Sequence, residues 1–379
     1  MRILFLFIGE PHQIFHALPI AAEMAAAGSD VEVAVASAGH LPVVEQVMAA
    51  YPGFSPRIRL LGQRGISHWL RARAIIRHPR LPILFGALRF LRQFDAIVVP
   101  ERTTTAIRHF LPRRTRLIFT PHGAGDRAIM LDPRDRHFDF VLVAGEKSEQ
   151  RLLDAGTIRP GHYALNGYVK LDLMTRLDKT RARLFDNDRP TVLYAPHFHR
   201  GLSSWDRFGR DIIDWFAAQD RYNLVAAPHI RLFAEASDGD RAAIKTLAIP
   251  GKIMIDLDSD RLFDMSYTSG SDLYLGDVSS QVYEFLATPR PCLFLNAHDA
   301  QWVGDPDYLF WTLGDVIDDM ADFPKALEQA AARHSRYIDA QRERLAESIG
   351  GDPAGAARRG AEAIARFLAK DAAQDKSGG

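Results

Sequence analysis

Short apolar runs and longer amphipathic runs alternate along the first half of the chain. Apolar stretches of four to six residues are typical of buried strands, and amphipathic stretches of eight or more are typical of helices. The predicted strands are 3–8, 31–36, 96–99, 116–120 and 140–143, and the predicted helices are 13–27, 42–50, 103–110 and 147–155. Strands and helices that alternate in this way build a parallel sheet with helices on both faces. We therefore expect a doubly wound α/β domain.

A second series of the same kind follows a charged break at 176–190. Its predicted strands are 191–195, 223–226, 252–255, 273–275 and 292–295, with helices between them. The two series predict two doubly wound Rossmann-type domains, residues 1–176 and 177–350, that face a central cleft. The pattern after 320 is almost wholly helical. We expect 351–379 to cross back over the two domains as a helix and to end in a frayed polar tail from 371 onward.

Composition fits a soluble enzyme with two cores. The chain has 379 residues, of which 47% are hydrophobic, and its net charge is zero. The charge is uneven, because the first 176 residues carry 23 Lys and Arg against 15 Asp and Glu, whereas the rest carry 24 against 32. The basic residues lack a recognition motif and the second half is acidic, which argues against nucleic-acid binding.

The single cysteine, Cys292, lies in a predicted apolar strand. A disulfide and a cysteine metal site are therefore excluded, and a reducing cytoplasm is expected. No apolar run approaches the roughly 18 residues needed to span a bilayer. Residues 1–7 are too short and poorly flanked for a signal peptide and are better explained as the first strand.

The segment 271–296 is the most informative stretch for chemistry. It predicts two buried strands joined by a loop and a helix, with Asp277 or Ser279 as the helix N-cap. Ser279 and Ser280 offer hydroxyls and free N–H groups at the helix start, which favours phosphate binding. Glu284 lies one turn further on the same face, where its carboxylate could accept ribose hydroxyls. A serine-capped helix without a ligand is the alternative.

Histidines follow several predicted strands, at the sheet edge where doubly wound folds bind ligands. His122 is the strongest candidate, because Gly123 and Gly125 leave space for a substrate. An imidazole with a pKa of about 6.5 suits the removal of a proton from a hydroxyl. His229, helped by Arg231, is expected to act as a cation toward phosphate. A solvated turn histidine without a role is the alternative for each.

The order of these motifs resembles the CDP-glycerol glycerophosphotransferases, a family of teichoic-acid primases and polymerases with GT-B architecture. The matching segments are Pro121–Gly123, Gly167–Asp172, Tyr194–Pro196, Pro228–His229, Ser271–Glu284, and Gly351 and Asp352 with Arg358. The resemblance covers roughly residues 115–365, and its most specific part is the segment 271–296. It implies a GT-B-like α/β fold.

The resemblance also implies a function. The C-terminal domain would bind a CDP-linked polyol phosphate, and the N-terminal domain would present an acceptor hydroxyl, with His122 as general base and His229 as a second catalytic histidine. The implied donor-binding residues are Pro196, His197, Arg231, Asp277, Ser279, Ser280 and Glu284, and the acceptor-side residues are Gly9, His12, Gly123 and Gly125. Departures from the family at His197, Ile230 and Val278 leave the head group open, glycerol or another.

The expected reaction is an in-line displacement in which the acceptor hydroxyl attacks the distal phosphorus of the donor and cytidine monophosphate leaves. Positioning and fixed hydrogen-bond donors would supply most of the catalysis. No metal or other cofactor is expected. Asp256, Asp258 and Asp260 alternate in a polar loop, which is more typical of a solvated turn than of a cation site.

The segment 71–92 interleaves arginines with apolar residues, and we interpret Arg73, Arg77 and Arg80 as membrane-facing. Such a segment can rest on the anionic cytoplasmic face of the inner membrane, which would suit a lipid-linked acceptor. Pro79 and Pro82 interrupt a single helix. A pair of ordinary domain helices with solvated arginines is the alternative.

Two other function classes remain open. One is a sugar-nucleotide enzyme of the same architecture, either a glycosyltransferase or a protein like the UDP-sugar 2-epimerases. The turn at 277–280 lacks the two glycines expected of an epimerase, which favours the first hypothesis. The other class is a non-catalytic module that binds a nucleotide, and the presence of His122 argues against it.

Overall fold

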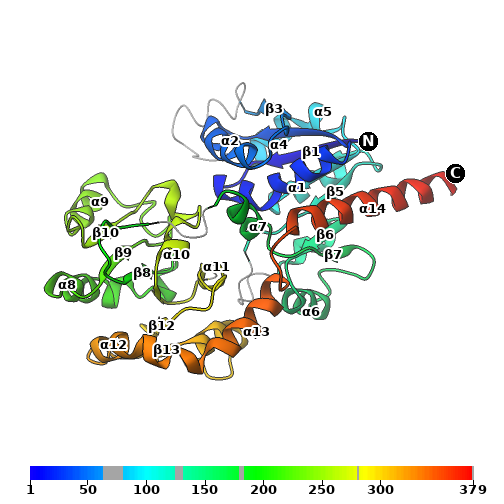
Figure 1. The fold of residues 1–379 in the computed structure, drawn as a ribbon. Helices are drawn as coiled ribbons and strands as arrows, with labels where there is room; N and C mark the ends of the chain where they lie inside the picture. Colours follow the sequence, from blue (N-terminus) through cyan, green and yellow to red (C-terminus); the bar gives the residue numbers. More distant parts are fainter. Residues whose placement is uncertain (63–79, 124–130, 179–182, 280, 378–379) are drawn as a thin grey trace. The chain divides into compact units, whose positions relative to one another are not determined.

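A computed structural model describes residues 1–62, 80–123, 131–178, 183–279 and 281–377. Two parallel sheets organise these residues (Figure 1). Residues 1–62, 80–123, 131–177 and 346–377 form one compact unit, and residues 178, 183–279 and 281–345 form the other. No helix within these ranges is long and apolar enough to cross a membrane.

The first unit contains a seven-stranded sheet with the strand order β3-β2-β1-β4-β5-β6-β7. Its strands are β1 (Arg2–Phe7), β2 (Asp30–Val35), β3 (Arg57–Leu60), β4 (Ala96–Val99), β5 (Arg116–Phe119), β6 (Phe140–Val143) and β7 (Tyr163–Leu165). Every neighbouring pair is parallel. The order reverses between β1 and β4, and open α/β sheets bind ligands at the carboxyl ends of the strands beside such a reversal.

Helices cover this sheet. They are α1 (Ile14–Ala26), α2 (Leu41–Ala50), α4 (Arg80–Gly86), α5 (Leu88–Leu91), α6 (Glu146–Asp154), α7 (Val169–Arg176) and α14 (Ala356–Ser377). Short 3-10 helices are η1 (Pro11–Gln13), η2 (Ala38–His40), η3 (Thr103–Phe110) and η5 (Pro133–His137). Helix α1 packs against α2, α7 and α14, which explains why almost all of its side chains are buried.

The second unit contains a six-stranded sheet with the order β10-β9-β8-β11-β12-β13. Its strands are β8 (Thr191–Ala195), β9 (Asn223–Ala226), β10 (Ile253–Ile255), β11 (Leu273–Gly276), β12 (Cys292–Leu295) and β13 (Asp315–Ile317). All five pairs are parallel. Successive residues of one strand, such as Val192 and Leu193, enter separate hydrophobic clusters. The sheet is therefore buried on both faces, which explains its continuous apolar strands.

The remaining helices lie between Arg200 and Ile349. The regular ones are α8 (Arg210–Ala218), α9 (Asp238–Lys245), α10 (Ser266–Gly270), α11 (Gln281–Phe285), α12 (Phe323–Arg333) and α13 (Ile338–Ile349). The short or irregular ones are η6 (Arg200–Leu202), η7 (Trp205–Gly209), η8 (Asp260–Leu262), η9 (Pro306–Leu313) and η10 (His334–Arg336).

The structure confirms the predicted strands to within about one residue at each end, but it adds three edge or near-edge strands. These are β3, β7 and β13, of three or four residues each. Strands β3 and β7 lie at the two edges of the first sheet, and neither has a fully buried residue. A strand that buries little apolar surface leaves no continuous apolar run in the sequence.

The last segment differs from the prediction in two ways. Within 351–379 the structure has the one expected helix, α14, but this helix starts only at Ala356, because Gly350, Gly351 and Gly355 have positive φ after α13. The expected frayed tail is wrong, since α14 continues to Ser377. Asp371 accepts a hydrogen bond of 2.5 Å from Nε of Arg116, which ties this part of the helix to the start of β5.

Two motifs from the sequence hold the start of α14 in the first unit. The Asp172 carboxylate is buried and accepts from the backbone N–H groups of Gly355 (3.1 Å) and Ala357 (3.0 Å). Arg359 donates to the carbonyl oxygen of Asn166 at 3.1 Å. Arg359, the neighbour of the motif residue Arg358, therefore ties the start of α14 to the turn after β7.

Replacing Asp172 by alanine should loosen α14, because two N–H groups at the helix start lose a charged acceptor. Charge-assisted bonds at a buried helix start contribute about 2 kcal/mol, which corresponds to roughly 30-fold less protection. Hydrogen–deuterium exchange of residues 346–377 measures this loss. Glu362→Ala on the exposed face of α14 is the control and should leave exchange nearly unchanged. Equal exchange in both variants would show that Asp172 does not anchor the helix.

Candidate functional site

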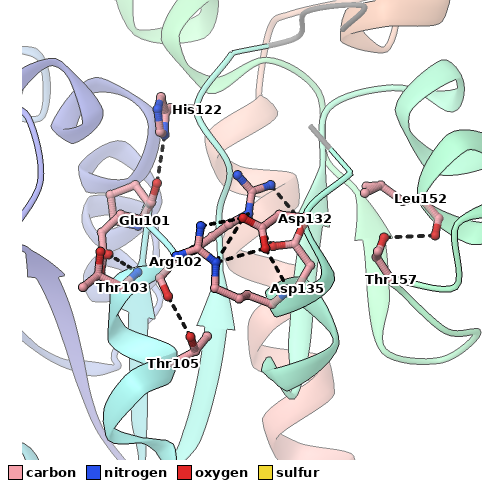
Figure 2. A network of polar contacts seen from close by, with 11 residues as sticks. Glu101, Arg102, Thr103, Thr105, His122, Asp132, Asp135, Leu152 and Thr157 are labelled. Atoms are coloured by element: carbon pink, nitrogen blue, oxygen red, sulfur yellow. Dashed lines mark hydrogen bonds and ion pairs between the residues drawn. The ribbon is translucent and has the colours of Figure 1, made fainter. Parts of the chain in front are cut away.

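The first group of candidate residues lies at the carboxyl ends of β1, β4 and β5. His122 follows β5, and Pro100 follows β4, the neighbouring strand. Nδ1 of His122 lies 2.9 Å from the carbonyl oxygen of Pro100 (Figure 2). Nε2 of Gln13, in the turn after β1, lies 3.2 Å from Nε2 of the same ring. The structure thus places His122 at the carboxyl edge of the first sheet, in contact with the turns after β1 and β4.

The Pro100 contact fixes the chemistry of His122. A carbonyl oxygen can only accept, so Nδ1 carries the proton and Nε2 of the neutral ring carries the lone pair. Gly123 follows with φ of 88°, a conformation that glycine adopts without steric cost. The turn therefore presents Nε2 as the basic nitrogen.

The surroundings of His122 favour its neutral form. Burial lowers the pKa of His122, and the nearby guanidinium groups of Arg102 and Arg80 lower it further, while Pro100 and Glu10 act in the opposite direction. A lowered pKa keeps the imidazole unprotonated at neutral pH, as a general base requires. The ring of His12 lies 5.7 Å from that of His122.

A carboxylate–guanidinium network that the sequence analysis missed supports the loop after β4. Arg102 donates from Nε and Nη2 to the two oxygens of Asp135, at 2.6 and 3.0 Å (Figure 2). Burial raises the pKa of Asp135, while the Arg102 pairing opposes that rise. Glu101 accepts from the backbone N–H of Thr103, which starts η3. These contacts hold the loop that carries the Pro100 carbonyl. In the sequence, the pair Glu101 and Arg102 just after the end of β4 was the feature that could have predicted this network.

The loop after β1 is also held from inside. His40 is completely buried, and its Nε2 lies 3.1 Å from the carbonyl oxygen of Gly9, while its Nδ1 lies 2.8 Å from Oγ of Ser37. Arg80 donates to the Glu10 carboxylate at 3.3 Å. This contact places Arg80 at the same sheet edge, where its charge acts on His122.

The second group lies at the carboxyl ends of β8, β9 and β11. Asp277 follows β11 and is almost fully buried. Its Oδ1 accepts from the backbone N–H groups of His197 and Val278, both at 2.9 Å, and its Oδ2 accepts from that of Ser204 at 2.5 Å. Burial raises the pKa of Asp277 to about 6. Asp277 thus joins the loops after β8 and β11, and its oxygens are engaged by backbone groups.

His197 and His229 share one hydrogen-bond arrangement. Nδ1 of His197 accepts from the backbone N–H of His199 at 3.0 Å, and Nδ1 of His229 accepts from that of Arg231 at 3.2 Å. In each neutral ring the proton must then reside on Nε2. The ring centroids are 6.2 Å apart. Each ring therefore carries its proton on Nε2, and an N–H donor of this kind suits the oxygens of an anion.

His229 differs from the prediction in its charge. Burial, followed by the charge of Arg231, lowers the pKa of His229 to about 4. The ring is neutral at pH 7, so it offers a hydrogen bond and not the predicted positive charge. The positive charge nearby belongs to Arg231, whose guanidinium lies 4.3 Å from the centre of the Phe198 ring. The centre of the Phe198 ring in turn lies 4.8 Å from the centre of the His229 ring.

The remaining donor-side candidates are near the same edge. Ser279 accepts from the backbone N–H of Gln281, the first residue of α11, at 3.3 Å, whereas Asp277 accepts from the backbone N–H of Val278. Helix α11 has only five residues, and Glu284 is buried on it. Pro196 accepts from the backbone N–H of His229 at 3.0 Å, which joins the loops after β8 and β9.

Four candidates lie outside the described residues, namely Gly125, Ser280, Arg73 and Arg77. Within the described part of the chain, no three His, Cys, Asp or Glu side chains gather as a metal site. The described groups offer a basic nitrogen on the first unit and neutral N–H donors on the second. This set can support proton transfer and anion binding.

No family model matches the sequence, and no curated sequence matches it. Solved structures match over nearly the whole chain. The S. aureus MnaA–UDP co-structure has a TM-score of 0.64 at 14% identity and covers 97% of this chain and 96% of its own. The UDP-GlcNAc 2-epimerase from Neisseria meningitidis bound to UDP-GlcNAc matches with a TM-score of 0.61 at 14% identity, and the match covers 98% of this chain and 100% of that chain. The wall teichoic acid polymerase TagF, soaked with CDPG, matches with a TM-score of 0.63 at 14% identity, and the match covers 98% of this chain and 89% of that chain. The likeness confirms the expected α/β GT-B-like fold.

The low pKa of His229 predicts an acid-sensitive second unit. As the pH falls from about 6.5 toward 4, the unfolded chain takes up a proton that folded His229 does not, so the free energy of unfolding decreases. Relative to His229→Asn, the wild type should lose roughly 2–3 kcal/mol over this range. The raised pKa of Asp277 has the opposite sign, but it is common to both proteins.

Tryptophan fluorescence during urea unfolding measures this difference, because four of the five tryptophans belong to the second unit: Trp205, Trp215, Trp302 and Trp311. His199→Asn replaces an exposed histidine of the second unit, in the loop after β8, and is the control. Its difference from wild type should not change with pH. A constant difference for His229→Asn as well would mean that His229 titrates normally.

Proposed function

We propose that the protein transfers a polyol phosphate, glycerol phosphate or a similar group, from a CDP-linked donor to a hydroxyl of a lipid-linked acceptor in cell-envelope biosynthesis. The observation that carries the proposal is the state of His122. Its Nδ1 proton is committed to the Pro100 carbonyl, which leaves a basic Nε2 at the carboxyl edge of the first sheet. The likeness to a wall teichoic acid polymerase and the motif order support the choice of substrate class.

The second unit binds the donor in this proposal. Nε2–H of His197 and Nε2–H of His229 donate to the phosphate oxygens, and Arg231 adds a positive charge. Ser279 at the start of α11 contributes a hydroxyl, and Glu284 accepts from the ribose. Neutral donors held by the backbone are already oriented before the reaction, so they stabilise phosphoryl charge without rearrangement.

The first unit binds the acceptor. Its hydroxyl oxygen attacks the distal phosphorus of the donor, and the bond from that phosphorus to the oxygen of cytidine monophosphate breaks. The hydroxyl proton passes to Nε2 of His122, and cytidine monophosphate leaves. His12 and Gly9 lie at the same sheet edge and contribute to the acceptor site.

The lipid-linked acceptor is supported by an exposed apolar cluster on the first unit. Leu81 and Phe85 of α4 and Phe110 of η3 are 45%, 45% and 53% exposed. The rings of Phe85 and Phe110 are 5.4 Å apart, and the exposed Arg113 and Arg114 follow Phe110. Aromatic rings beside arginines suit the interface of an anionic bilayer. Such contact would hold a cytoplasmic protein on the inner face of the membrane.

A sugar-nucleotide enzyme is the second candidate function. The epimerase structures match as well as the polymerase does, and two of them hold UDP or UDP-GlcNAc. In that case the donor-side histidines would bind a uridine nucleotide. The nucleotide base distinguishes the two hypotheses directly.

A thermal-shift screen of CDP-glycerol, CDP-ribitol, CDP, CMP, UDP-GlcNAc and UDP should favour the cytidine nucleotides. A ligand at 100 times its Kd stabilises the folded protein by about 2.7 kcal/mol. His197→Ala and His229→Ala should weaken the cytidine shift, whereas His199→Ala, the exposed control, should retain it. Larger shifts with uridine nucleotides would replace the proposal by the second candidate.

His122→Ala should leave the cytidine shift intact and lower turnover by roughly 10²–10⁴-fold, the usual contribution of a positioned general base. His109→Ala removes an exposed histidine of the first unit and is the control. Full turnover of His122→Ala with a confirmed donor and acceptor would assign the base to another residue.

Phe85→Glu together with Phe110→Glu should reduce co-sedimentation with vesicles that contain anionic lipid. Binding of the wild type should also weaken as salt screens the arginines over a Debye length of roughly 10 Å. Val303→Glu changes an apolar residue that is 81% exposed on the second unit and is the control. Binding that the double variant retains in full would argue against this cluster as the membrane contact.

A further inference from the structure

We propose that Asp277 is a positioning residue that holds the two donor-side histidines, His197 and His229, in one arrangement. It acts on them through a single peptide group of the backbone and does not touch the donor itself. The inference rests on the proposed function, in which both rings donate to phosphate oxygens. It gives Asp277 a role that differs from the direct donor contact expected from the sequence.

The peptide group between Pro196 and His197 is held at both of its polar ends. Its carbonyl oxygen accepts from the backbone N–H of His229 at 3.0 Å, and its N–H donates to Oδ1 of Asp277 at 2.9 Å. The first partner belongs to the loop after β9 and the second to the loop after β11. A peptide group is planar, so the two bonds together fix its orientation. Both histidines are thus held by the same peptide group.

The strand order explains why these three loops meet. Ala195, the last residue of β8, pairs with Gly276, the last residue of β11. Asp277 therefore leaves the sheet beside Pro196. Strand β9 pairs with the other side of β8. The loop after β8 consequently has the loops after β9 and β11 as its neighbours.

The state of the Asp277 side chain suits a positioning role. Asp277 is 1% exposed, and its oxygens also accept from the backbone N–H groups of Val278 at 2.9 Å and Ser204 at 2.5 Å. Burial raises the pKa of Asp277 to about 6, which still leaves the carboxylate ionised at neutral pH. An ionised carboxylate only accepts, so it can serve all three N–H groups at once. A side chain that is enclosed in this way does not reach a ligand.

The backbone of Asp277 is held as well. Nε1–H of Trp311, in η9, donates to the carbonyl oxygen of Asp277 at 2.9 Å. Trp311 is 2% exposed and belongs to a hydrophobic cluster of the second unit. The carboxylate therefore starts from a fixed backbone position, and it transmits this position to the peptide group of the histidines.

The test measures the binding of CDP and of UDP to the full chain by calorimetry at neutral pH. Asp277→Ala removes the acceptor of three N–H groups and should weaken binding of either nucleotide by roughly 10-fold or more, the contribution of one hydrogen bond to a charged group. Asp277→Asn keeps one acceptor oxygen, so its affinity should lie between those of Asp277→Ala and the wild type. If Asp277→Ala does not fold, Asp277→Asn still gives the comparison.

Asp272→Ala is the matched control. Asp272 directly precedes β11, at the opposite end of the strand, and its carboxylate accepts from the backbone N–H of Thr191 at 2.8 Å. This variant also removes a carboxylate that joins β11 to β8, but it does so far along the strand from the histidines. Its nucleotide affinity should equal that of the wild type.

A double-mutant cycle distinguishes positioning of the histidines from a general loss of structure. In a background that carries His197→Ala and His229→Ala, the groups that Asp277 positions are absent. Asp277→Asn should then weaken nucleotide binding by less than about 2-fold. An equal loss in both backgrounds, or wild-type affinity in a folded Asp277 variant, would overturn the inference.

Histidine NMR adds a readout that a change in stability does not move. The ring-nitrogen chemical shifts of His197 and His229 should show a single Nε2–H tautomer in the wild type, and His197 should lose it in Asp277→Ala. Wild-type rings that carry the proton on Nδ1 contradict the inference even if no variant folds. The proposed function fails separately, when UDP binds better than CDP, because either nucleotide offers phosphates to the histidines.

Discussion

Burial of both faces of a parallel sheet constrains where this protein can place polar chemistry. In the second unit, neighbouring residues of each strand enter different hydrophobic clusters, so no strand has a face left for polar groups. The first sheet has a similar row of buried central strands, including β4 and β6. Charged side chains of these central, fully buried strands are then confined to the strand ends. His122, Gln13, His197, His229 and Asp277 all follow strands at the carboxyl edge of their sheet.

Loops at that edge need support, because histidines on loose turns would not keep a fixed proton position. The second unit uses a buried carboxylate directly, since Asp277 accepts from backbone groups of two loops. In the first unit the buried carboxylate acts through an arginine. Asp135 accepts from the guanidinium of Arg102, and Arg102 belongs to the same loop as Pro100. Burial of either carboxylate is unfavourable by itself, as their raised pKa values indicate. Several N–H donors offset that cost in each case.

The sequence predicts the buried strands well because each is an uninterrupted apolar run, and it misses β3, β7 and β13 because short strands that bury little surface have no such run. His122 is predictable from a histidine and a glycine directly after a strand. The contact of Gln13 with this ring is not predictable, because the two residues are 109 positions apart in the chain. The Arg102–Asp135 pair is similarly non-local.

The proton positions of the histidines are the finest level at which the fold determines chemistry here, and no sequence pattern reports them. One residue type is given two roles by the group that meets Nδ1. A carbonyl oxygen at Nδ1 of His122 makes Nε2 a base, whereas backbone N–H groups at Nδ1 of His197 and His229 make Nε2 a donor. Burial lowers the pKa of both His122 and His229, so the neutral forms on which this distinction depends persist at neutral pH. The backbone of each turn, more than the identity of its histidine, thus decides whether the ring accepts or supplies a proton.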